Sequence, residues 1–347
     1  MPAALLTAVR RIEVREVPAP EPGPDEVLVE LSAIGICGSD RHYWRHGRIG
    51  DTAVKFPFLL GHEPAGRVTA LGRGVRGPEE GQRVAVEPGI SCGRCEQCLR
   101  GRGNLCHHVR FLGSPPVAGA FQRFLKMPAE CVLPLPPGVD EALGSAAEPL
   151  GIALHTYHLV NLRPAETVAI IGGGPIGLGA AALARRLGAR AVALSEPRPA
   201  RRQAAQALGV ERVTSEAPEE FLAAVKAATA GDGAEVVLEC CGEPGALDLA
   251  VNAAARGGRV GFVAIPEVDS VQVNPHEWRR RELDVVNVRR SNRTLHRCLA
   301  LLAEGDMGLK AAGFFSQTVG LAGLQGTFEA LEDEGSPLVK VVLDARL

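Results

Sequence analysis

An apolar run, 167–171, is followed at once by a glycine-rich turn and then by a helical pattern that ends near Leu187. The turn has the spacing G-x-G-x-x-G and contains Gly172, Gly174, Pro175, Ile176 and Gly177. The first glycine permits a tight turn, the second lets the backbone approach a pyrophosphate, and the third lets the helix pack close to the strand. A strand, this turn and a helix in that order predict a βαβ unit that binds a dinucleotide. The alternative is an ordinary tight turn between a strand and a helix.

The next predicted strand, 191–195, ends directly before Glu196. A carboxylate about 20 residues past the glycine motif can accept hydrogen bonds from both ribose hydroxyls and repels a 2′-phosphate. We therefore predict NAD as the cofactor in preference to NADP. Three arginines that follow, Arg198, Arg201 and Arg202, keep NADP open, because any of them could bind the extra phosphate. Otherwise they begin a solvated helix, with one of them, which we take as Arg201, lying on the adenine.

The pattern of predicted secondary structure changes near the middle of the sequence. Residues 1–150 contain short alternating segments, such as 26–31 and 82–86, which read as β-strands separated by turns. From about residue 165 onward, strands alternate with helices, a pattern typical of a parallel sheet covered by helices on both faces. Further strands are predicted at 235–239, 259–264 and 339–343, and a helix at 293–304. The 347 residues suit two domains. We predict an α/β protein with a doubly wound Rossmann sheet and a second, β-rich domain.

Four of the nine cysteines are closely spaced in one glycine-containing loop. They are Cys92, Cys95, Cys98 and Cys106. Four thiolates at this spacing can close around one tetrahedral zinc ion, which leaves no open position and so indicates a structural site. Two disulfides are the alternative, but in an intracellular chain clustered cysteines are more often metal ligands. The other unassigned cysteines, Cys131, Cys240, Cys241 and Cys298, are expected to be buried inert thiols.

Charge and hydropathy exclude several function classes. The net charge is −2, and no basic patch or tail suggests a surface for nucleic acid or membranes. The first residues lack a charged-then-apolar signal pattern, and no uninterrupted apolar run is long enough to span a bilayer. We expect a cytoplasmic protein that acts on a small molecule.

A second group of metal-binding side chains lies outside the cysteine loop. Cys37 follows a Gly-Ile pair, His62 and Glu63 are adjacent, and Glu148 precedes a Pro-Leu pair. Taken singly, the cysteine suggests a core residue, the histidine a satisfied hydrogen-bonding group, and each glutamate a surface residue. Beside a dinucleotide motif, however, they predict a catalytic zinc, which needs about three protein ligands and an open position.

At this point the chain resembles the zinc-containing medium-chain dehydrogenases, in which these motifs occur in the same order. The resemblance covers essentially the whole chain and is closest to sorbitol and xylitol dehydrogenases. It rests further on His42-Tyr-Trp-Arg-His-Gly-Arg-Ile-Gly50, Arg83-Val-Ala-Val-Glu-Pro88, Ser114-Pro-Pro116 and Glu148-Pro-Leu150. It implies a catalytic GroES-like domain at 1–153 and 288–347, an NAD-binding domain at 154–287, and a homo-oligomer, either a tetramer or a dimer.

The resemblance also implies residue roles. Catalytic zinc is expected at Cys37, His62 and Glu63, with Glu148 as a fourth ligand or a group that reaches the metal through water. Ser39 would touch the substrate oxygen and His42 would pass its proton outward, since a histidine titrates near neutral pH. The alternative for His42 is an ordinary surface-loop histidine. The substrate pocket would use Tyr43, Phe111 and Arg289.

One position departs from the sorbitol dehydrogenase pattern. Those enzymes commonly carry Arg-Tyr where this chain has Arg289-Arg290. If Arg290 faces the pocket, a second cation would favour an anionic sugar such as an aldonic acid over a neutral polyol. If it faces solvent, the expectation of a polyol is unchanged. The other substrates that we keep open are an inositol, 2,3-butanediol and threonine. A protein that binds the cofactor without catalysis is a further alternative.

Overall fold

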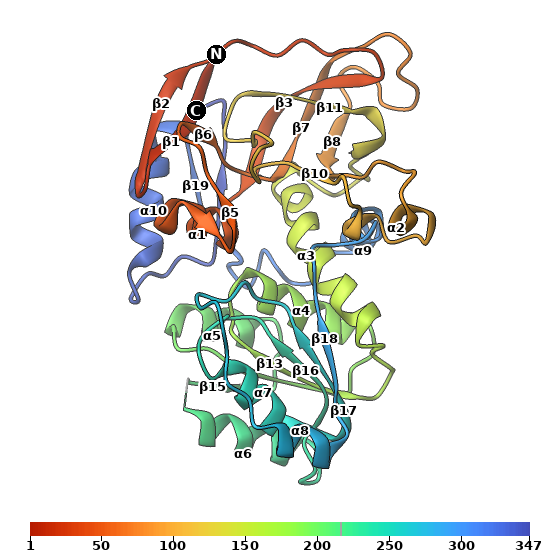
Figure 1. The fold of residues 1–347 in the computed structure, drawn as a ribbon, viewed down its shortest axis with the longest axis vertical. Helices are drawn as coiled ribbons and strands as arrows, with labels where there is room; N and C mark the ends of the chain where they lie inside the picture. Colours follow the sequence, from red (N-terminus) through yellow and green to blue (C-terminus); the bar gives the residue numbers. More distant parts are fainter. Residues whose placement is uncertain (216) are drawn as a thin grey trace.

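The computed structural model describes residues 1–215 and 217–347 and consists of two regions (Figure 1). We call the upper one, built on β1–β12, β19 and β20, the β-rich region. We call the lower one, built on β13–β18, the parallel-sheet region. The chain starts in the β-rich region, passes through the parallel-sheet region and returns, so that both termini lie in the upper half of the view.

The main sheet of the β-rich region has the order β12-β8-β7-β3-β20-β19, with β11 also paired to β3. Its strands are β3 (Glu26–Gly35), β7 (Glu63–Leu71), β8 (Arg83–Val86), β11 (Phe124–Pro128), β12 (Val132–Pro134), β19 (Phe315–Val319) and β20 (Lys340–Leu343). All pairs are antiparallel except β19 with β20. Strand β20 therefore carries the C-terminal segment back to the centre of the first sheet, beside β3.

Smaller elements surround this sheet. The short strands are β1 (Pro2–Ala8), β2 (Arg11–Glu16), β4 (Arg48–Ile49), β5 (Thr52–Ala53), β6 (Phe58–Leu59), β9 (Gly89–Ile90) and β10 (Arg110–Phe111). The helices are α1 (Gly38–His46), α2 (Glu96–Leu99), α10 (Leu324–Glu332) and three 3₁₀ turns, η1 (Gly103–Leu105), η2 (Ala129–Cys131) and η3 (Leu321–Gly323). Of these, α1 and β10 carry side chains of the site described below.

The parallel-sheet region has six strands in the order β15-β14-β13-β16-β17-β18, and every pair is parallel. They are β13 (Thr167–Ile171), β14 (Ala191–Ser195), β15 (Arg212–Thr214), β16 (Ala234–Glu239), β17 (Ala254–Phe262) and β18 (Asp284–Asn287). The helices are α4 (Pro175–Arg186), α5 (Pro199–Ala207), α6 (Pro218–Ala228), α7 (Ala246–Ala253) and α8 (Pro275–Arg281). Numbered from β13, this is the 3-2-1-4-5-6 order of a doubly wound dinucleotide-binding fold.

The sheet is buried on both faces because alternate side chains enter different cores. In β13, Val168 and Ile170 pack with α4, whereas Ala169 and Ile171 pack with α6 and α7. Such strands read as continuous apolar runs, which is why 167–171 and 191–195 were predictable as strands, and both are confirmed.

One helix joins the two regions. Helix α3 (Glu141–Leu159) packs against β3, β7 and β8 on one side and against α4 and α9 (Leu295–Ala303) on the other. Pro149 lies inside it and has no N–H to donate to the carbonyl one turn earlier. The predicted boundary at residues 153 and 154 falls within this continuous helix. We therefore retain the division into 1–153 with 288–347, and 154–287, as a proposal.

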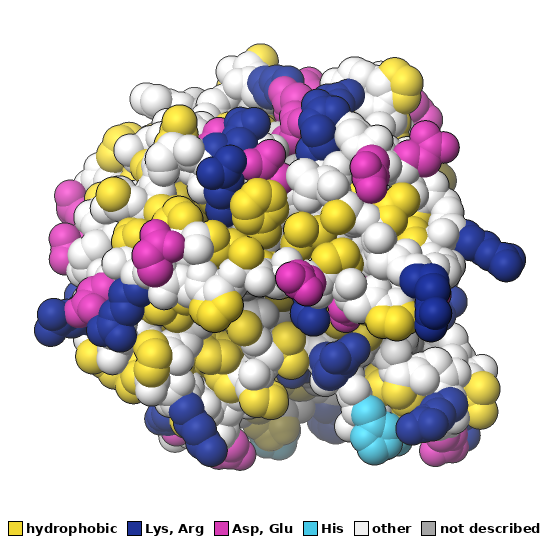
Figure 2. All heavy atoms as spheres, turned by 90° about the horizontal axis from the view of Figure 1, so that it is seen from above, with side chains coloured by type: hydrophobic (Ala, Val, Ile, Leu, Met, Phe, Trp, Pro, Cys, Tyr) yellow, Lys and Arg dark blue, Asp and Glu magenta, His cyan; other side chains and the backbone are white. Residues whose placement is uncertain are grey.

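Most of the remaining expected elements are also confirmed. The strand expected at 259–264 starts earlier, since β17 begins at Ala254, and the helix expected at 293–304 is α9. No helix among the described residues is long and apolar enough to cross a membrane. On the face shown in Figure 2, Lys and Arg side chains are interspersed with Asp and Glu. This mixed surface agrees with the net charge of −2.

Candidate active site

A cleft of about 1290 Å³ lies between the two regions and is lined by residues of both. The glycine motif after β13, Glu196 after β14 and Arg290 after β18 all follow the carboxyl ends of parallel strands. Ligands of doubly wound folds bind at this edge of the sheet. Opposite them, α1 and the first residues of β7 form the other wall.

Three of the predicted zinc ligands are brought together in this wall. Ligand atoms of Cys37, His62 and Glu63 all lie within 4.8 Å of one another. Cys37 is the residue before α1, and Glu63 begins β7 opposite Gly35 of β3. The antiparallel pairing of β3 with β7 thus places side chains distant in sequence around one point.

Asp40 orients this group, and sequence reasoning did not assign it a role. Its carboxylate is fully buried and accepts hydrogen bonds from the backbone N–H groups of Cys37 and Gly61, both at 3.0 Å. It also lies 3.5 Å from Nδ1 of His62. Burial alone would lower the pKa of His62. The charges of Asp40 and Cys37 raise the pKa by more than burial lowers it, so the net shift is upward. A carboxylate on one imidazole nitrogen fixes the ring and leaves the other nitrogen for a metal.

Glu63 has a cation partner that was also missed. Lys340 of β20 is 1% exposed, forms an ion pair with the Glu63 carboxylate and donates to the carbonyl oxygen of Ile36 at 3.0 Å. A side chain at Gly35 would collide with this pair, because its Cβ would lie 1.9 Å from Glu63 Oε2. The signal in the sequence was a lysine inside the apolar strand 339–343.

The donor set fits a zinc ion. Glu63 Oε1 is buried and receives no hydrogen bond from the described residues, so one carboxylate oxygen is left for another partner. A thiolate, an imidazole and a carboxylate are ligands that zinc accepts, and three of them leave an open position.

Glu148 lies near this group without completing it. It is 4% exposed on α3, lines the same cleft, and is not among the atoms within 4.8 Å of one another. Burial raises its pKa to about 8, with Glu63 and Glu87 adding to the rise and His62 and Lys340 opposing it. Whether it would bind zinc directly or through water stays a prediction.

The two expected relay residues both line the cleft from α1. Ser39 Oγ lies 3.4 Å from Nε2 of His62. His42 is only partly buried, and its Nε2 lies 3.7 Å from a carboxylate oxygen of Glu267, which belongs to the parallel-sheet region. Burial lowers the pKa of His42, whereas Glu267 raises it. Glu267 also pairs with Arg45 and His46 across the cleft, at 2.8 and 3.0 Å.

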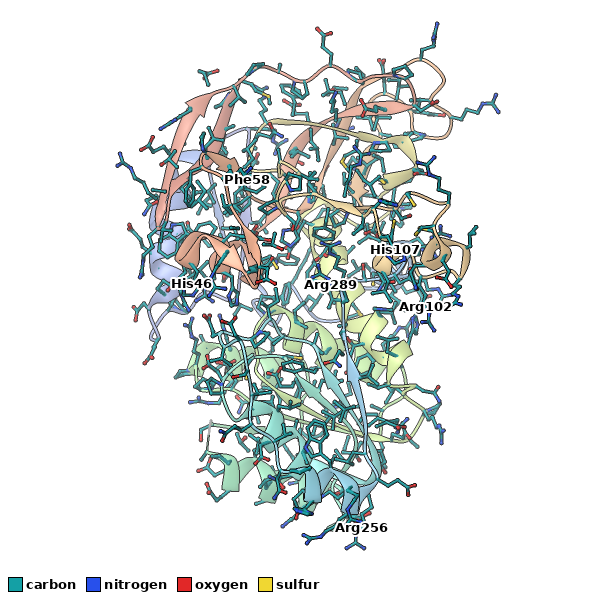
Figure 3. The ribbon with its side chains drawn as sticks, viewed as in Figure 1. His46, Phe58, Arg102, His107, Arg256 and Arg289 are labelled. Carbon is teal, nitrogen blue, oxygen red and sulfur yellow. The ribbon has the colours of Figure 1, made fainter. Side chains whose placement is uncertain are left out.

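The expected pocket residues Tyr43, Phe111 and Arg289 also line the cleft. The Tyr43 hydroxyl lies 3.2 Å from Ser114 Oγ, and the Phe111 ring lies 5.5 Å from the ring of His62. Arg289 lies between the two regions in Figure 3 and lines the cleft. The carbonyl of Arg289 accepts a hydrogen bond from Asn104 at 2.9 Å. Arg290, whose direction the sequence left open, faces the cleft, with its guanidinium 4.1 Å from the centre of the Phe111 ring.

The nucleotide half of the cleft has the geometry that the glycine motif predicts. Gly172 has φ +97°, and a Cβ on Gly177 would lie 1.8 Å from the carbonyl oxygen of Gly172. Pro175 occupies the first turn of α4. Glu196 is 3% exposed and accepts from the backbone N–H groups of Gly173 at 2.7 Å and Arg198 at 2.9 Å. The carboxylate is thereby fixed at the edge of the motif.

The arginines after Glu196 differ in their surroundings. Arg202 donates to the carbonyl oxygen of Glu196 at 2.9 Å, so its side chain is tied to the backbone. Arg201 Nη1 lies 3.9 Å from Glu196, and burial lowers the pKa of Arg201 to about 10. Arg198 and Arg201 both line the cleft and keep the ability to contact a cofactor.

The cysteine loop forms a separate lobe beside α9 (Figure 1). All four sulfur atoms lie within 4.8 Å of one another, and the nine cysteines of the chain are free. Cys95 Sγ lies 3.5 Å from Cys98 and 3.8 Å from Cys106, which is too far for a disulfide and suits a shared ion. Backbone N–H groups of Cys98 and His107 lower the pKa of Cys95 to about 6, which favours the thiolate. His107 appears in this lobe in Figure 3.

Comparisons with known proteins agree with this geometry. The model of the alcohol dehydrogenase GroES-like domain matches residues 23–137, and that of the zinc-binding dehydrogenase matches residues 175–304. A sorbitol dehydrogenase of Bacillus subtilis is 37% identical over 89% of this chain and 88% of its own. An L-idonate 5-dehydrogenase of Vitis vinifera is 34% identical over 89% and 85%.

A solved structure assigned as a zinc-binding dehydrogenase from Sinorhizobium meliloti, bound to NADP, is also similar. It has a TM-score of 0.87 and 33% identity, over 99% of this chain and 98% of that one.

Proposed function

The chain belongs to the zinc-binding alcohol dehydrogenase family, and on that premise we propose that it oxidises a secondary hydroxyl of a polyol, such as sorbitol or xylitol, to the ketose with NAD. The observation that carries the proposal is the buried group of Cys37, His62 and Glu63 in the same cleft as the glycine motif. Relatives named sorbitol dehydrogenase at 33 to 37% identity support the substrate class.

Cys37, His62 and Glu63 would hold the zinc, and Glu148 would support it from α3. When bound, zinc supplies Lewis acidity toward the substrate hydroxyl, and NAD supplies the hydride acceptor. The chain's own contribution is positioning. Asp40 fixes the His62 ring from its far side, and the buried Lys340 holds the buried Glu63 carboxylate.

The proton of the substrate hydroxyl needs a path to solvent. Ser39 Oγ lies beside the metal group and would receive this proton. His42, one turn later on α1 and only partly buried, would carry it outward. Glu267 would then favour the protonated form of His42, since it is the carboxylate closest to that ring.

We assign NAD because Glu196 is buried at the end of β14 and would meet the 2′ position of the adenine ribose. Arg198 and Arg201 support NADP as the second candidate, as does the similar NADP-bound structure. The test compares kcat/KM with each cofactor at saturating substrate. At least about tenfold preference for NAD is expected from one carboxylate against a 2′-phosphate, and equal efficiencies would contradict the assignment.

The function itself is tested with purified protein and a panel of sorbitol, xylitol, aldonates, an inositol, 2,3-butanediol and threonine, each with NAD. Turnover of polyhydroxylated chains is expected. Metal analysis should find about two zinc ions per chain, one for each site. Activity on an aldonate, butanediol or threonine with none on sorbitol or xylitol, or full activity after complete removal of metal, would contradict the proposal.

Location and assembly are also proposals. We infer a cytoplasmic enzyme, since the cysteines of the described chain are free and clustered as for a metal. We infer a homo-oligomer by analogy with the family, and sedimentation of the purified protein would test it. We propose small molecules as the only partners, without nucleic acid or membrane. Limited proteolysis of the full chain, with the cut sites mapped, would test the two-domain division.

A further inference from the structure

Arg290 is a cation in the substrate half of the cleft without an anionic partner. Among the described residues it forms no ion pair, and its Nη1 is buried without a hydrogen-bond acceptor. By contrast, Arg41 and Arg45, which also line the cleft, both bind Glu332, at 2.9 and 2.8 Å. A buried donor without an acceptor costs free energy unless a ligand supplies one.

The position of the side chain is well defined. Its guanidinium lies on one ring, Phe111, which also contacts the ring of His62. Phe111 is held by the pairing of β10 with β9, opposite Gly89. A single short substrate chain can therefore present a hydroxyl beside His62 and another group beside Arg290.

The charge at this point is not cancelled by the surroundings. Burial and the neighbouring Arg289 together lower the pKa of Arg290 to about 10, so the side chain still carries its charge at neutral pH. Tyr43 and Glu148 are the groups that favour this charge, and neither lies within ion-pair distance. The backbone of Arg290 is left-handed, with φ +59°, a conformation that is uncommon for a residue with a side chain.

We propose that Arg290 forms an anion subsite, so that the preferred substrates are polyhydroxylated chains with a terminal oxyanion, a carboxylate or a phosphate. This rests on the proposed function, because the same site oxidises the chain's secondary hydroxyl. A guanidinium binds an oxyanion through two parallel charge-assisted hydrogen bonds, which a neutral hydroxyl cannot match. The reaction balance is unchanged: hydride passes to NAD, one proton leaves, and the oxyanion stays intact.

The test measures kcat/KM with NAD for sorbitol, gluconate and sorbitol 6-phosphate, using the zinc-loaded enzyme and its Arg290→Met variant. Methionine keeps the contact with Phe111 and removes the charge. The wild type should prefer at least one anionic substrate over sorbitol, and the variant should lose at least about tenfold on that substrate while sorbitol changes less than about threefold. The better of the two anions identifies a carboxylate or a phosphate as the ligand.

Arg293→Met is the matched control, since Arg293 is exposed in the same loop, lies outside the cleft and is also left-handed, with φ +54°. This control variant should leave kcat/KM unchanged for the anionic substrate and for sorbitol. Equal loss on neutral and anionic substrates in Arg290→Met would overturn the subsite and leave Arg290 as packing on Phe111. Good turnover of sorbitol with no preference for anions would also overturn it, while the proposed function stood. Failure of all three substrates would instead contradict the proposed function.

Discussion

The two metal-binding groups of this chain are built in opposite ways. The cysteine lobe takes all its ligands from residues 92–106, near the surface, and local backbone N–H groups stabilise the thiolates of Cys92 and Cys95. The cleft group takes Cys37, His62 and Glu63 from two strand ends. It is then completed by Asp40 from α1 and by Lys340 from the last strand.

The lobe is a site that one loop can form by itself, whereas the cleft group forms only when the whole β-rich region is folded. In the lobe, sequence spacing alone brings the four sulfur atoms together. In the cleft, the ligand cluster depends on strand register, since Gly35 lies opposite Glu63 and β20 lies beside β3. A substitution in the lobe should therefore affect only the lobe, whereas a substitution in the cleft group should also affect the strands that position it.

The largest effect is expected from Cys37→Ser, which separates the two groups. Losing this ligand should lower kcat/KM by about 1,000-fold or more, because several kcal/mol of charge stabilisation disappear with the metal. Metal analysis should show one zinc lost and the lobe's zinc retained, with NAD affinity unchanged. Retention of both ions with full activity would show that this group is not the catalytic metal site.

Lys340→Met tests the dependence of the cleft on a distant strand. It leaves the buried Glu63 carboxylate without its cation, so the free energy of unfolding should fall by about 3 to 5 kcal/mol. Urea titration of the metal-free protein measures this loss. Adding Glu63→Gln to the same variant should recover much of it.

Lys310→Met is the matched control for that comparison. Lys310 pairs with Asp140 at 2.7 Å, but both side chains are nearly half exposed. Its loss should cost no more than about 1 kcal/mol. Equal costs for the two lysine variants would mean that the cleft pair is no more important than a surface pair.

Cys98→Ser probes the lobe. The lobe's affinity for zinc should fall by at least about 100-fold, measured by competition with a chelator. The kcat of chains that stay folded should change less than about threefold, since the lobe lies outside the cleft. A loss of turnover as large as that of Cys37→Ser would contradict the separation of the two groups.

The smallest effect is expected from Gly35→Ala. The added Cβ would lie 1.9 Å from Glu63 Oε2 and 2.8 Å from Lys340 Cε, so the pair must shift. Overpacking of this kind costs about 1 to 3 kcal/mol. Gly38→Ala has open space at the corresponding point and is the control for thermal unfolding. Equal melting temperatures for the two variants would show that the ion pair is not tightly confined.

The same contrast explains which features of the structure could be predicted from the sequence. The cysteine spacing, the glycine motif and the apolar strands were predictable because each signal is local and periodic. Lys340 and Asp40 were missed because a single charged residue in a strand or helix does not identify its partner. The direction of Arg290 depended on the position of Phe111, which β10 fixes by pairing with β9. Such long-range register has no local signature.

The pairing of β20 with β3 also sets an order of events during synthesis. Lys340 is translated long after Glu63, so a chain still on the ribosome holds that carboxylate without its cation. The cysteine lobe can close as soon as Cys106 has emerged. Zinc should thus enter the lobe first, and the cleft should mature only after β20 leaves the exit tunnel.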